Sequence, residues 1–222
     1  MGDLNQLSFV KENSKIVSGP ILEIGSKNYG NTPDFRSVFP NEEYVGVDME
    51  YGHGVDVVLD FTSDLTVIKK SLKGKKFKTV ICFSVLEHCK NPFKMSRNIM
   101  RILDKNGVLF VSVPFSWRIH GYPSDYWRFT PEGVKLLFPE LNFEKHAGNI
   151  STNKIGESGQ INHHMFRSEL TIAKGIKLKR YNYLVGMFIL LCRKLKILPS
   201  VFDYPYLSPP VMVNMIGKKK SD

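Results

Sequence analysis

Residues 21–30 read Ile-Leu-Glu-Ile-Gly-Ser-Lys-Asn-Tyr-Gly, a short apolar strand that runs into a glycine turn. Four further runs rich in valine and isoleucine follow it, at 44–48 (YVGVD), 55–61 (VDVVLDF), 79–85 (TVICFSV) and 108–114 (VLFVSVP). These runs hardly alternate between apolar and polar residues, which is typical of strands that are covered on both faces of a parallel sheet. The sequence therefore predicts a core of parallel strands.

Helices are predicted between these strands. A helix begins at Asn91-Pro92, carries apolar residues at helical spacing up to Leu103 and ends before Gly107. Thr130 is the expected N-cap of another helix, with Pro131 at its first position, and a short helix is predicted over 64–72. Strands that alternate with helices predict a Rossmann-like, doubly wound, mostly parallel α/β sheet.

We expect one domain over residues 1–222, with a helical N-terminal extension over 1–18. An insertion over 151–208 with a basic apolar helix is expected before a last strand near 209–216. The three cysteines fit neither a disulfide framework nor a zinc pattern, and the N-terminus lacks the apolar core of a signal peptide. These features predict a cytoplasmic protein. The net charge of +10 suggests an anionic partner or a simple aid to solubility.

The glycine turn departs from the dinucleotide-binding fingerprint G-x-G-x-x-G. Lys27 occupies the position of the middle glycine, and the carboxylate of Glu23 beside the turn would repel a diphosphate. A carboxylate there suits a cofactor with an ammonium group and no phosphate, such as S-adenosylmethionine. Asp48 ends the second strand, where an acid can accept hydrogen bonds from ribose hydroxyls. Asp60 and Phe61 end the third, where they suit an adenine amino group and ring, or act only as a cap and a core residue.

The motif Val85-Leu86-Glu87-His88 follows the fourth strand, and a helix and the segment LDKNGVL (103–109) come after it. In this order the chain resembles the class I S-adenosylmethionine-dependent methyltransferases that share the Val-Leu-Glu-His signature. The chain departs from that family in having Lys-Asn-Gly in place of Pro-Gly-Gly and in lacking the second glycine of the cofactor turn. The resemblance implies a seven-stranded sheet, methyltransferase activity and S-adenosylmethionine bound at Glu23, Gly25, Ser26, Asp48, Met49, Asp60, Phe61, Phe83 and Ser84.

Residues 114–131 (PFSWRIHGYPSDYWRFTP) are dense in aromatic and charged side chains. They resemble a subgroup of these enzymes that is associated with bacterial surface-glycan synthesis. Substrate contacts are predicted at Trp117, Tyr126 and Arg128, although a lid that only covers the cofactor explains the aromatic residues as well. An alcohol acceptor must lose a proton as it attacks, and the candidate catalytic residues are His88, His120 and Asp125.

Two other features suggest functions of their own. His163 and His164 are adjacent, but no nearby carboxylate completes a ligand set, so no metal is predicted. Residues 174–196 mix basic and apolar residues, which fits a helix on an anionic membrane surface, a dimer contact or a helix packed on the sheet.

The function predicted from these residues is O-methylation of a small molecule or a glycan. A nucleic-acid methyltransferase is an alternative because of the positive charge, although the chain has no Asn-Pro-Pro-Tyr motif and no recognisable RNA-binding module. A dehydrogenase that uses NAD is disfavoured by Lys27 and Glu23. A binding protein that has kept the cofactor pocket without catalysis is the last alternative.

Overall fold

The computed structural model describes residues 3–30, 32–121, 124–143, 148–151, 155–156, 158–161, 187, 191, 194–195 and 211–220. The chain divides into two compact units, one formed by residues 1–161 with 211–222 and the other by residues 162–210. His163, His164 and nearly all of segment 174–196 lie outside the described residues. Among the described residues, no helix has the length and apolar character needed to cross a bilayer.

The first unit is built on one mixed sheet with the strand order β3-β2-β1-β4-β5-β9-β7-β8, and β6 pairs with β9 beside this path. Strands β1 to β5 pair in parallel, whereas β9 runs antiparallel to β5. This arrangement confirms the predicted α/β sheet of mostly parallel strands. The strands are β1 Ile21–Ile24, β2 Tyr44–Asp48, β3 Val57–Val58, β4 Phe77–Phe83, β5 Leu103–Pro114, β6 Leu141–Phe143, β7 Asn149–Ser151, β8 Ser158–Gln160 and β9 Met212–Lys219.

The helices α1, α3 and α4 each begin at a residue whose side chain caps them. Asn91 accepts a hydrogen bond from the Lys94 amide at the start of α3 (Pro92–Ile102), and Thr130 accepts one from Gly133 at the start of α4 (Pro131–Leu137). Both helix starts and the Thr130 cap were predicted, whereas the capping role of Asn91 was not. Asp3 and Gln6 form a reciprocal capping box on α1 (Leu4–Glu12). The remaining helices are α2 (Leu65–Ser71) and the 3₁₀ turns η1 (Ser14–Ile16), η2 (Arg36–Val38) and η3 (Leu86–His88).

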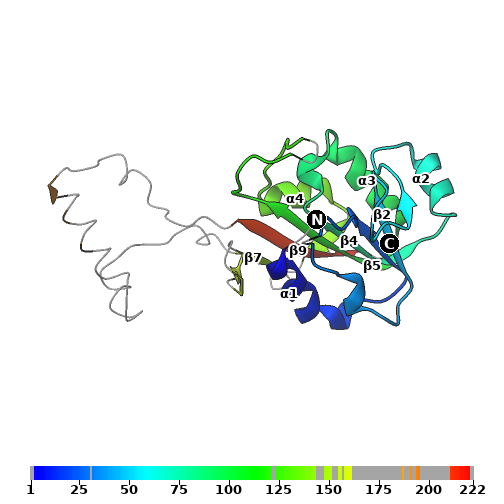
Figure 1. Cartoon of the computed structure of the whole chain (residues 1–222), viewed down its shortest axis with the longest axis horizontal. Helices are drawn as coiled ribbons and strands as arrows, with labels where there is room; N and C mark the ends of the chain where they lie inside the picture. The colour runs from blue at the N-terminus through cyan, green and yellow to red at the C-terminus, as the bar shows by residue number, and fades with distance from the viewer. Residues whose placement is uncertain are drawn as a thin grey trace. The chain divides into compact units, whose positions relative to one another are not determined.

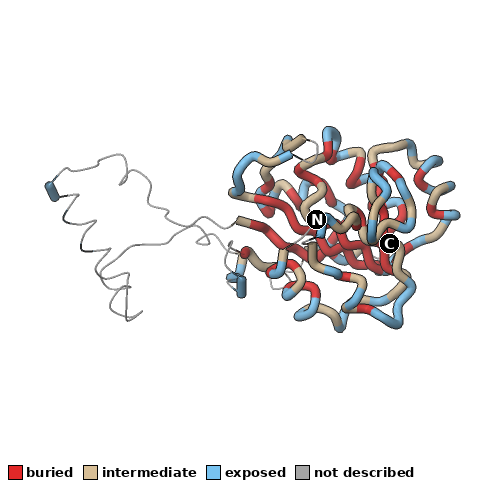
Figure 2. Tube along the Cα trace, viewed as in Figure 1, coloured by how far each residue is buried: buried red, intermediate tan, exposed pale blue. Residues whose placement is uncertain are grey.

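Alternate strand residues bury two separate cores, one on each face of the sheet. Leu22, Cys82 and Leu109 belong to the larger core, which the helices α2, α3 and α4 cover. Their strand neighbours Ile21, Ile81 and others belong to the smaller core under α1. Figure 1 shows α2, α3 and α4 on one side of the sheet and α1 on the other, and Figure 2 shows the sheet between them as buried. Both faces are therefore covered, as the apolar strand pattern predicted.

The structure corrects three details of these predictions. The run 55–61 forms a strand only at Val57–Val58, because Val55 closes a turn onto Gly52 and the Asp60 carboxylate caps a second turn at Thr62. The helix expected to reach Gly107 ends at Ile102, since Leu103 is extended and pairs with β4. The sheet of the described residues has nine strands rather than seven, because short strands also pair beside β9.

Candidate active site

A pocket opens at the carboxyl ends of β1, β2 and β4, which is the edge where α/β sheets bind ligands. We call it the strand-end pocket. Six of the nine residues predicted to bind the cofactor line it, and so does His88 from the candidate catalytic set. These six residues are Gly25, Asp48, Met49, Asp60, Phe61 and Ser84.

Asp48 is held in this pocket by backbone amides. Its Oδ2 accepts a hydrogen bond from the Lys27 amide at 3.1 Å, and its Oδ1 accepts one from the Glu50 amide at 3.2 Å. The turn after β1 can approach β2 this closely because Gly25 adopts a positive φ of 82° and because Gly54 has no side chain. A Cβ at Gly54 would lie 2.6 Å from the Ser26 carbonyl oxygen. Each carboxylate oxygen of Asp48 keeps a lone pair for a ligand hydroxyl.

The wall made by Asp60 and Phe61 is supported from α3. Asn98 donates hydrogen bonds to the carbonyl oxygens of Phe61 and Ser63, at 2.8 and 2.9 Å. Asp60 accepts from the amide and hydroxyl of Thr62, both at 2.7 Å from Oδ1. These bonds fix an acid and an aromatic ring side by side on one wall of the pocket.

The other three predicted cofactor residues lie elsewhere. Glu23 and Ser26 line a second cavity, beside η2 and residues 53–56. There the Glu23 carboxylate accepts a hydrogen bond from the Tyr44 hydroxyl at 2.8 Å, and burial raises the pKa of Glu23 to about 7. Phe83 is buried in the smaller core, where its ring packs edge-on against Phe35.

A buried polar network reaches the pocket from α1. Gln6 is fully buried, and its amide donates hydrogen bonds to the Ser112 hydroxyl at 2.6 Å and to the Ser84 hydroxyl at 3.1 Å. Ser112 in turn donates to Asn214 of β9 at 2.6 Å. Ser84 lines the pocket with a positive φ of 52°, so Gln6 supports a strained backbone position. Gln6 was not predicted as a site residue, because its only signal in the sequence is a polar side chain on the apolar face of the helix.

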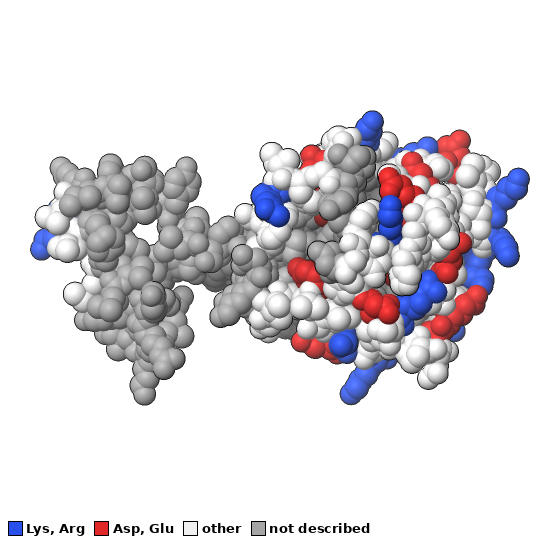
Figure 3. Space-filling model, viewed as in Figure 1, with Lys and Arg blue, Asp and Glu red and all other residues white. Residues whose placement is uncertain are grey.

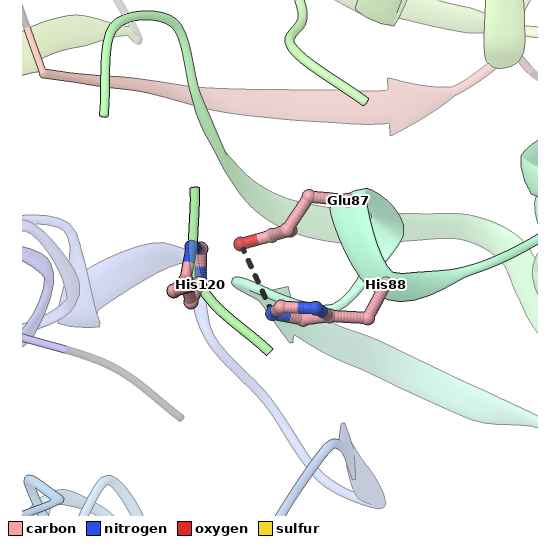
Figure 4. Close-up of side chains that lie close together, drawn as sticks. All are labelled: Glu87, His88 and His120. Atoms are coloured by element: carbon pink, nitrogen blue, oxygen red, sulfur yellow. Dashed lines mark ion pairs between the residues drawn. The ribbon is translucent and has the colours of Figure 1, made fainter. Parts of the chain in front are cut away.

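Glu87, His88 and His120 gather into one cluster beside the strand-end pocket, as Figure 4 shows. One ligand atom from each of the three residues lies within 4.8 Å of the other two. Oε1 of Glu87 is 4.0 Å from Nε2 of His88, and the two imidazole rings meet edge to face with centroids 4.8 Å apart. The two candidate catalytic histidines, which come from different segments, are therefore neighbours.

Both histidines are held through Nδ1. Nδ1 of His88 is 2.7 Å from the Ser124 carbonyl oxygen, and Nδ1 of His120 is 3.0 Å from Oδ2 of Asp125. A proton on each Nδ1 satisfies these acceptors and leaves the lone pair on Nε2. Burial lowers the pKa of His88, so this ring is neutral at pH 7.

Glu87 is the buried acid of the cluster. Its side chain is 1% exposed, and Oε2 has no hydrogen-bond partner among the described residues. Burial raises the pKa of Glu87 to about 8 and the charge of Asp125 adds to the rise, while a backbone hydrogen bond and the charge of Arg128 oppose it only in part. At neutral pH burial therefore favours the protonated form of the Glu87 carboxyl group.

Asp125 and Arg128 form a paired clamp behind His120. Both guanidinium nitrogens of Arg128 bind the Asp125 carboxylate, at 2.5 and 2.7 Å, which holds the pKa of Asp125 well below its usual range. Arg128 also donates to the carbonyl oxygens of Trp117 and Arg118. The guanidinium of Arg128 is thus engaged in ordering the segment that carries His120. The other predicted substrate residues, Trp117 and Tyr126, are 41% and 44% exposed.

Comparisons with known proteins agree with this arrangement. A family model described as a methyltransferase domain matches residues 4–148. An S-adenosylmethionine-dependent methyltransferase from Archaeoglobus fulgidus is similar in structure, with a TM-score of 0.53, 14% identity and 96% of this chain and 92% of that chain covered. The N-methyltransferase NodS from Bradyrhizobium japonicum WM9, solved with S-adenosyl-L-homocysteine, has a TM-score of 0.51, 11% identity and coverages of 98% and 86%.

Coclaurine N-methyltransferase, solved with N-methylheliamine and S-adenosylhomocysteine, has a TM-score of 0.55, 15% identity and coverages of 96% and 71%. No match was found among the curated proteins. The low identities to the solved structures show a common fold, while the family model covers most of the first unit. The match over residues 4–148, which include every residue of the strand-end pocket, shows that the chain belongs to the methyltransferase-domain family and has the fold of S-adenosylmethionine-dependent methyltransferases.

Proposed function

We propose that the chain binds S-adenosylmethionine in the strand-end pocket and transfers its methyl group to a hydroxyl oxygen of a small molecule or glycan. The observation that carries this proposal is that two carboxylates and a candidate base line one pocket. Asp48 and Asp60, which suit ribose and adenine, line the same pocket as His88. His88 also belongs to the cluster with Glu87 and His120. A cofactor bound at Asp48 and Asp60 would therefore lie next to an acceptor bound at the histidine cluster.

The described residues fit this cofactor. Asp48 offers lone pairs to two ribose hydroxyls, and Asp60 with Phe61 offers an acceptor and an apolar ring to adenine. When bound, S-adenosylmethionine supplies a methyl group on a sulfonium that is already electrophilic. The chain has to align the acceptor and exclude water, which is mainly a matter of proximity and orientation.

The cluster of Glu87, His88 and His120 favours an oxygen acceptor. A hydroxyl must lose its proton to become a good nucleophile, whereas a neutral amine attacks through its own lone pair. Nε2 of His88 and Nε2 of His120 carry lone pairs that can receive this proton, and Asp125 orients His120. The half-exposed rings of Trp117 and Tyr126, in the segment that carries His120, suit the apolar face of a sugar or planar acceptor.

Calorimetric titration with S-adenosylmethionine and S-adenosylhomocysteine tests the cofactor site. The wild type should bind both, and Asp48→Ala should weaken binding about 10- to 100-fold because charge-assisted hydrogen bonds are lost. Asp104→Ala is the matched control, since Asp104 lies near the opposite end of the sheet, where β5 begins. Equal affinities in all three proteins, or no binding by the wild type, would contradict the proposal.

Transfer of a labelled methyl group to panels of hydroxyl and amine acceptors tests the chemistry. We expect label in hydroxyl compounds, and we expect His88→Ala and His120→Ala to lower kcat with little change in cofactor affinity. Label found only in amines would overturn the assignment of an oxygen acceptor while leaving the cofactor site intact.

A further inference from the structure

The cluster of Glu87, His88 and His120 has the composition of a metal site as well as that of a base. Two imidazoles and one carboxylate are ligands that Zn²⁺ and other divalent transition metals take in proteins. Three protein ligands are also the number found in catalytic zinc sites, which keep a fourth position for water or substrate. The three residues come from two segments that are distant in sequence, so no local motif indicated this set. The only histidines considered for a metal from the sequence were the adjacent pair His163-His164.

The surroundings of the cluster strengthen this reading. In metal sites, a ligating histidine usually gives its other ring N–H to a carboxylate or a backbone carbonyl. Both arrangements are present here, since His120 faces the Asp125 carboxylate through Nδ1 and His88 faces the Ser124 carbonyl oxygen. The Arg128 guanidinium fixes Asp125 in turn. Both rings are therefore oriented before any ion binds.

Glu87 supplies the second, independent observation. Its side chain is 99% buried, its Oε2 has no hydrogen-bond partner among the described residues, and its Oε1 points toward Nε2 of His88 (Figure 4). A buried carboxylate oxygen without a hydrogen-bond partner is destabilising unless a cation or a donor reaches it. A divalent ion beside Oε1 would be such a partner, and it would keep the carboxylate ionised.

The distances require only a small contraction. Ligand atoms around a tetrahedral Zn²⁺ lie about 3.4 Å apart, given metal–nitrogen distances of about 2.0 to 2.1 Å. The present separations are 4.0 Å between Glu87 Oε1 and His88 Nε2 and at most 4.8 Å across the whole set. The side chain of His120 is 22% exposed, so an ion can approach from its side.

We propose that Glu87, His88 and His120 bind one divalent transition-metal ion of the Zn²⁺ class, whose open position takes the acceptor hydroxyl. The catalytic part of this inference rests on the proposed function, whereas binding of the ion does not. With the ion bound, the two imidazoles act as ligands and not as the base. The ion lowers the pKa of the bound hydroxyl, which releases its proton to solvent. The oxygen then forms the new bond to the methyl carbon as the carbon–sulfur bond breaks, and the sulfur keeps the electron pair of that bond.

The test starts from untagged full-length protein that has been dialysed against EDTA and then against metal-free buffer. Zn²⁺ is titrated calorimetrically and bound zinc is counted by mass spectrometry, with Co²⁺ absorption as a report of coordination. We expect one ion per chain at about 1 µM or tighter, weakened at least 100-fold in His120→Ala and His88→Ala. His53→Ala and the double variant His163→Ala/His164→Ala are matched histidine controls that should bind as the wild type does.

Glu87→Gln keeps the shape of the buried side chain and should also weaken Zn²⁺ binding, and titration with S-adenosylhomocysteine reports whether each variant is folded. The ion site is overturned if the wild type binds no ion, or if His120→Ala and His88→Ala both keep it. Methyl transfer that is equally fast in EDTA overturns the catalytic role of the ion. Cofactor binding is measured separately, so a failed ion site leaves the proposed function standing. Conversely, an ion that binds without any methyl transfer supports the site alone.

Discussion

Glu23 holds its proton to an unusually high pH. Burial raises its pKa from 4.5 to about 7, helped by Asp34, and the hydrogen bond from Tyr44 and the charge of Arg36 oppose this only in part. Between about pH 4.5 and pH 7 the folded protein keeps a proton that the unfolded chain has lost. The contribution of Glu23 to the free energy of unfolding is therefore fully present at low pH and is lost as the pH rises through this window.

Replacing Glu23 with glutamine should remove this dependence. We expect the Glu23 contribution in the wild type to fall by about 1 to 3 kcal/mol between pH 4.5 and pH 7. The curve of Glu23→Gln should lack that decline, while the exposed-carboxyl control Glu12→Gln should follow the wild type. Urea unfolding at several pH values measures the difference. Parallel curves for Glu23→Gln and the wild type would show that the carboxyl group titrates normally.

Some residues that line the strand-end pocket could be predicted from the sequence, whereas the prediction for Glu23 was wrong about its location. The sequence placed Gly25, Asp48 and Phe61 at this pocket because each lies at or just after the end of a predicted strand, and strand ends meet at one edge of a parallel sheet. Glu23 lies inside the strand, where alternation places it on the same face as Ile21 and away from the pocket wall at Ile24. The prediction of Glu23 as a cofactor residue followed from its position along the chain and left out this alternation.

Helix α1 is joined to the sheet by apolar and polar contacts. The ring of Phe9 packs edge-on against Phe110 with centroids 6.1 Å apart, and Gln6 binds Ser84 and Ser112. A helical extension was predicted, but its docking was not, since the network joins residues 78 and 106 positions apart. Such pairings leave no local pattern in a sequence.

The Gln6 network should therefore couple α1 to the cofactor. Gln6→Ala leaves Ser84 and Ser112 without their donor, and we expect a loss of about 1 to 3 kcal/mol of unfolding free energy. Cofactor affinity should fall several-fold, because Ser84 lines the pocket. Lys11→Ala, an exposed change on the same helix, is the control. Reduced stability with unchanged affinity for S-adenosylhomocysteine would show that the network only holds the helix in place.

The positive charge is distributed unevenly over the molecule. Residues 162–210 carry eight Lys or Arg against two Asp or Glu, so they contribute most of the net charge of +10. On the face of the first unit seen in Figure 3, Lys and Arg are interspersed with Asp and Glu. The described surface in that view thus has no broad field of one sign.

A ligand that binds only the folded chain should raise its stability as a whole. S-adenosylhomocysteine at 100 times its Kd adds about 2.7 kcal/mol, which is about 5 to 10 °C in Tm for a chain of this size. NAD at the same concentration should give no shift, since Lys27 occupies the position of the middle glycine that lets a backbone approach a diphosphate. Differential scanning calorimetry measures both. A shift with NAD alone would point to the dehydrogenase alternative.

Because β9 lies near the C-terminal end of the sequence and pairs with β5, the edge of β5 stays unpaired for part of the time that the chain is being synthesised. β9 pairs with β5 along its length, from Val108 opposite Lys218 to Pro114 opposite Met212. At about 5 to 20 residues per second, a ribosome needs roughly 5 to 20 seconds to pass from β5 to β9. Throughout that interval the nascent chain presents an unpaired, apolar strand edge, which is open to pairing with other chains. The burden on cellular chaperones should therefore fall on this edge, and it ends when β9 leaves the exit tunnel.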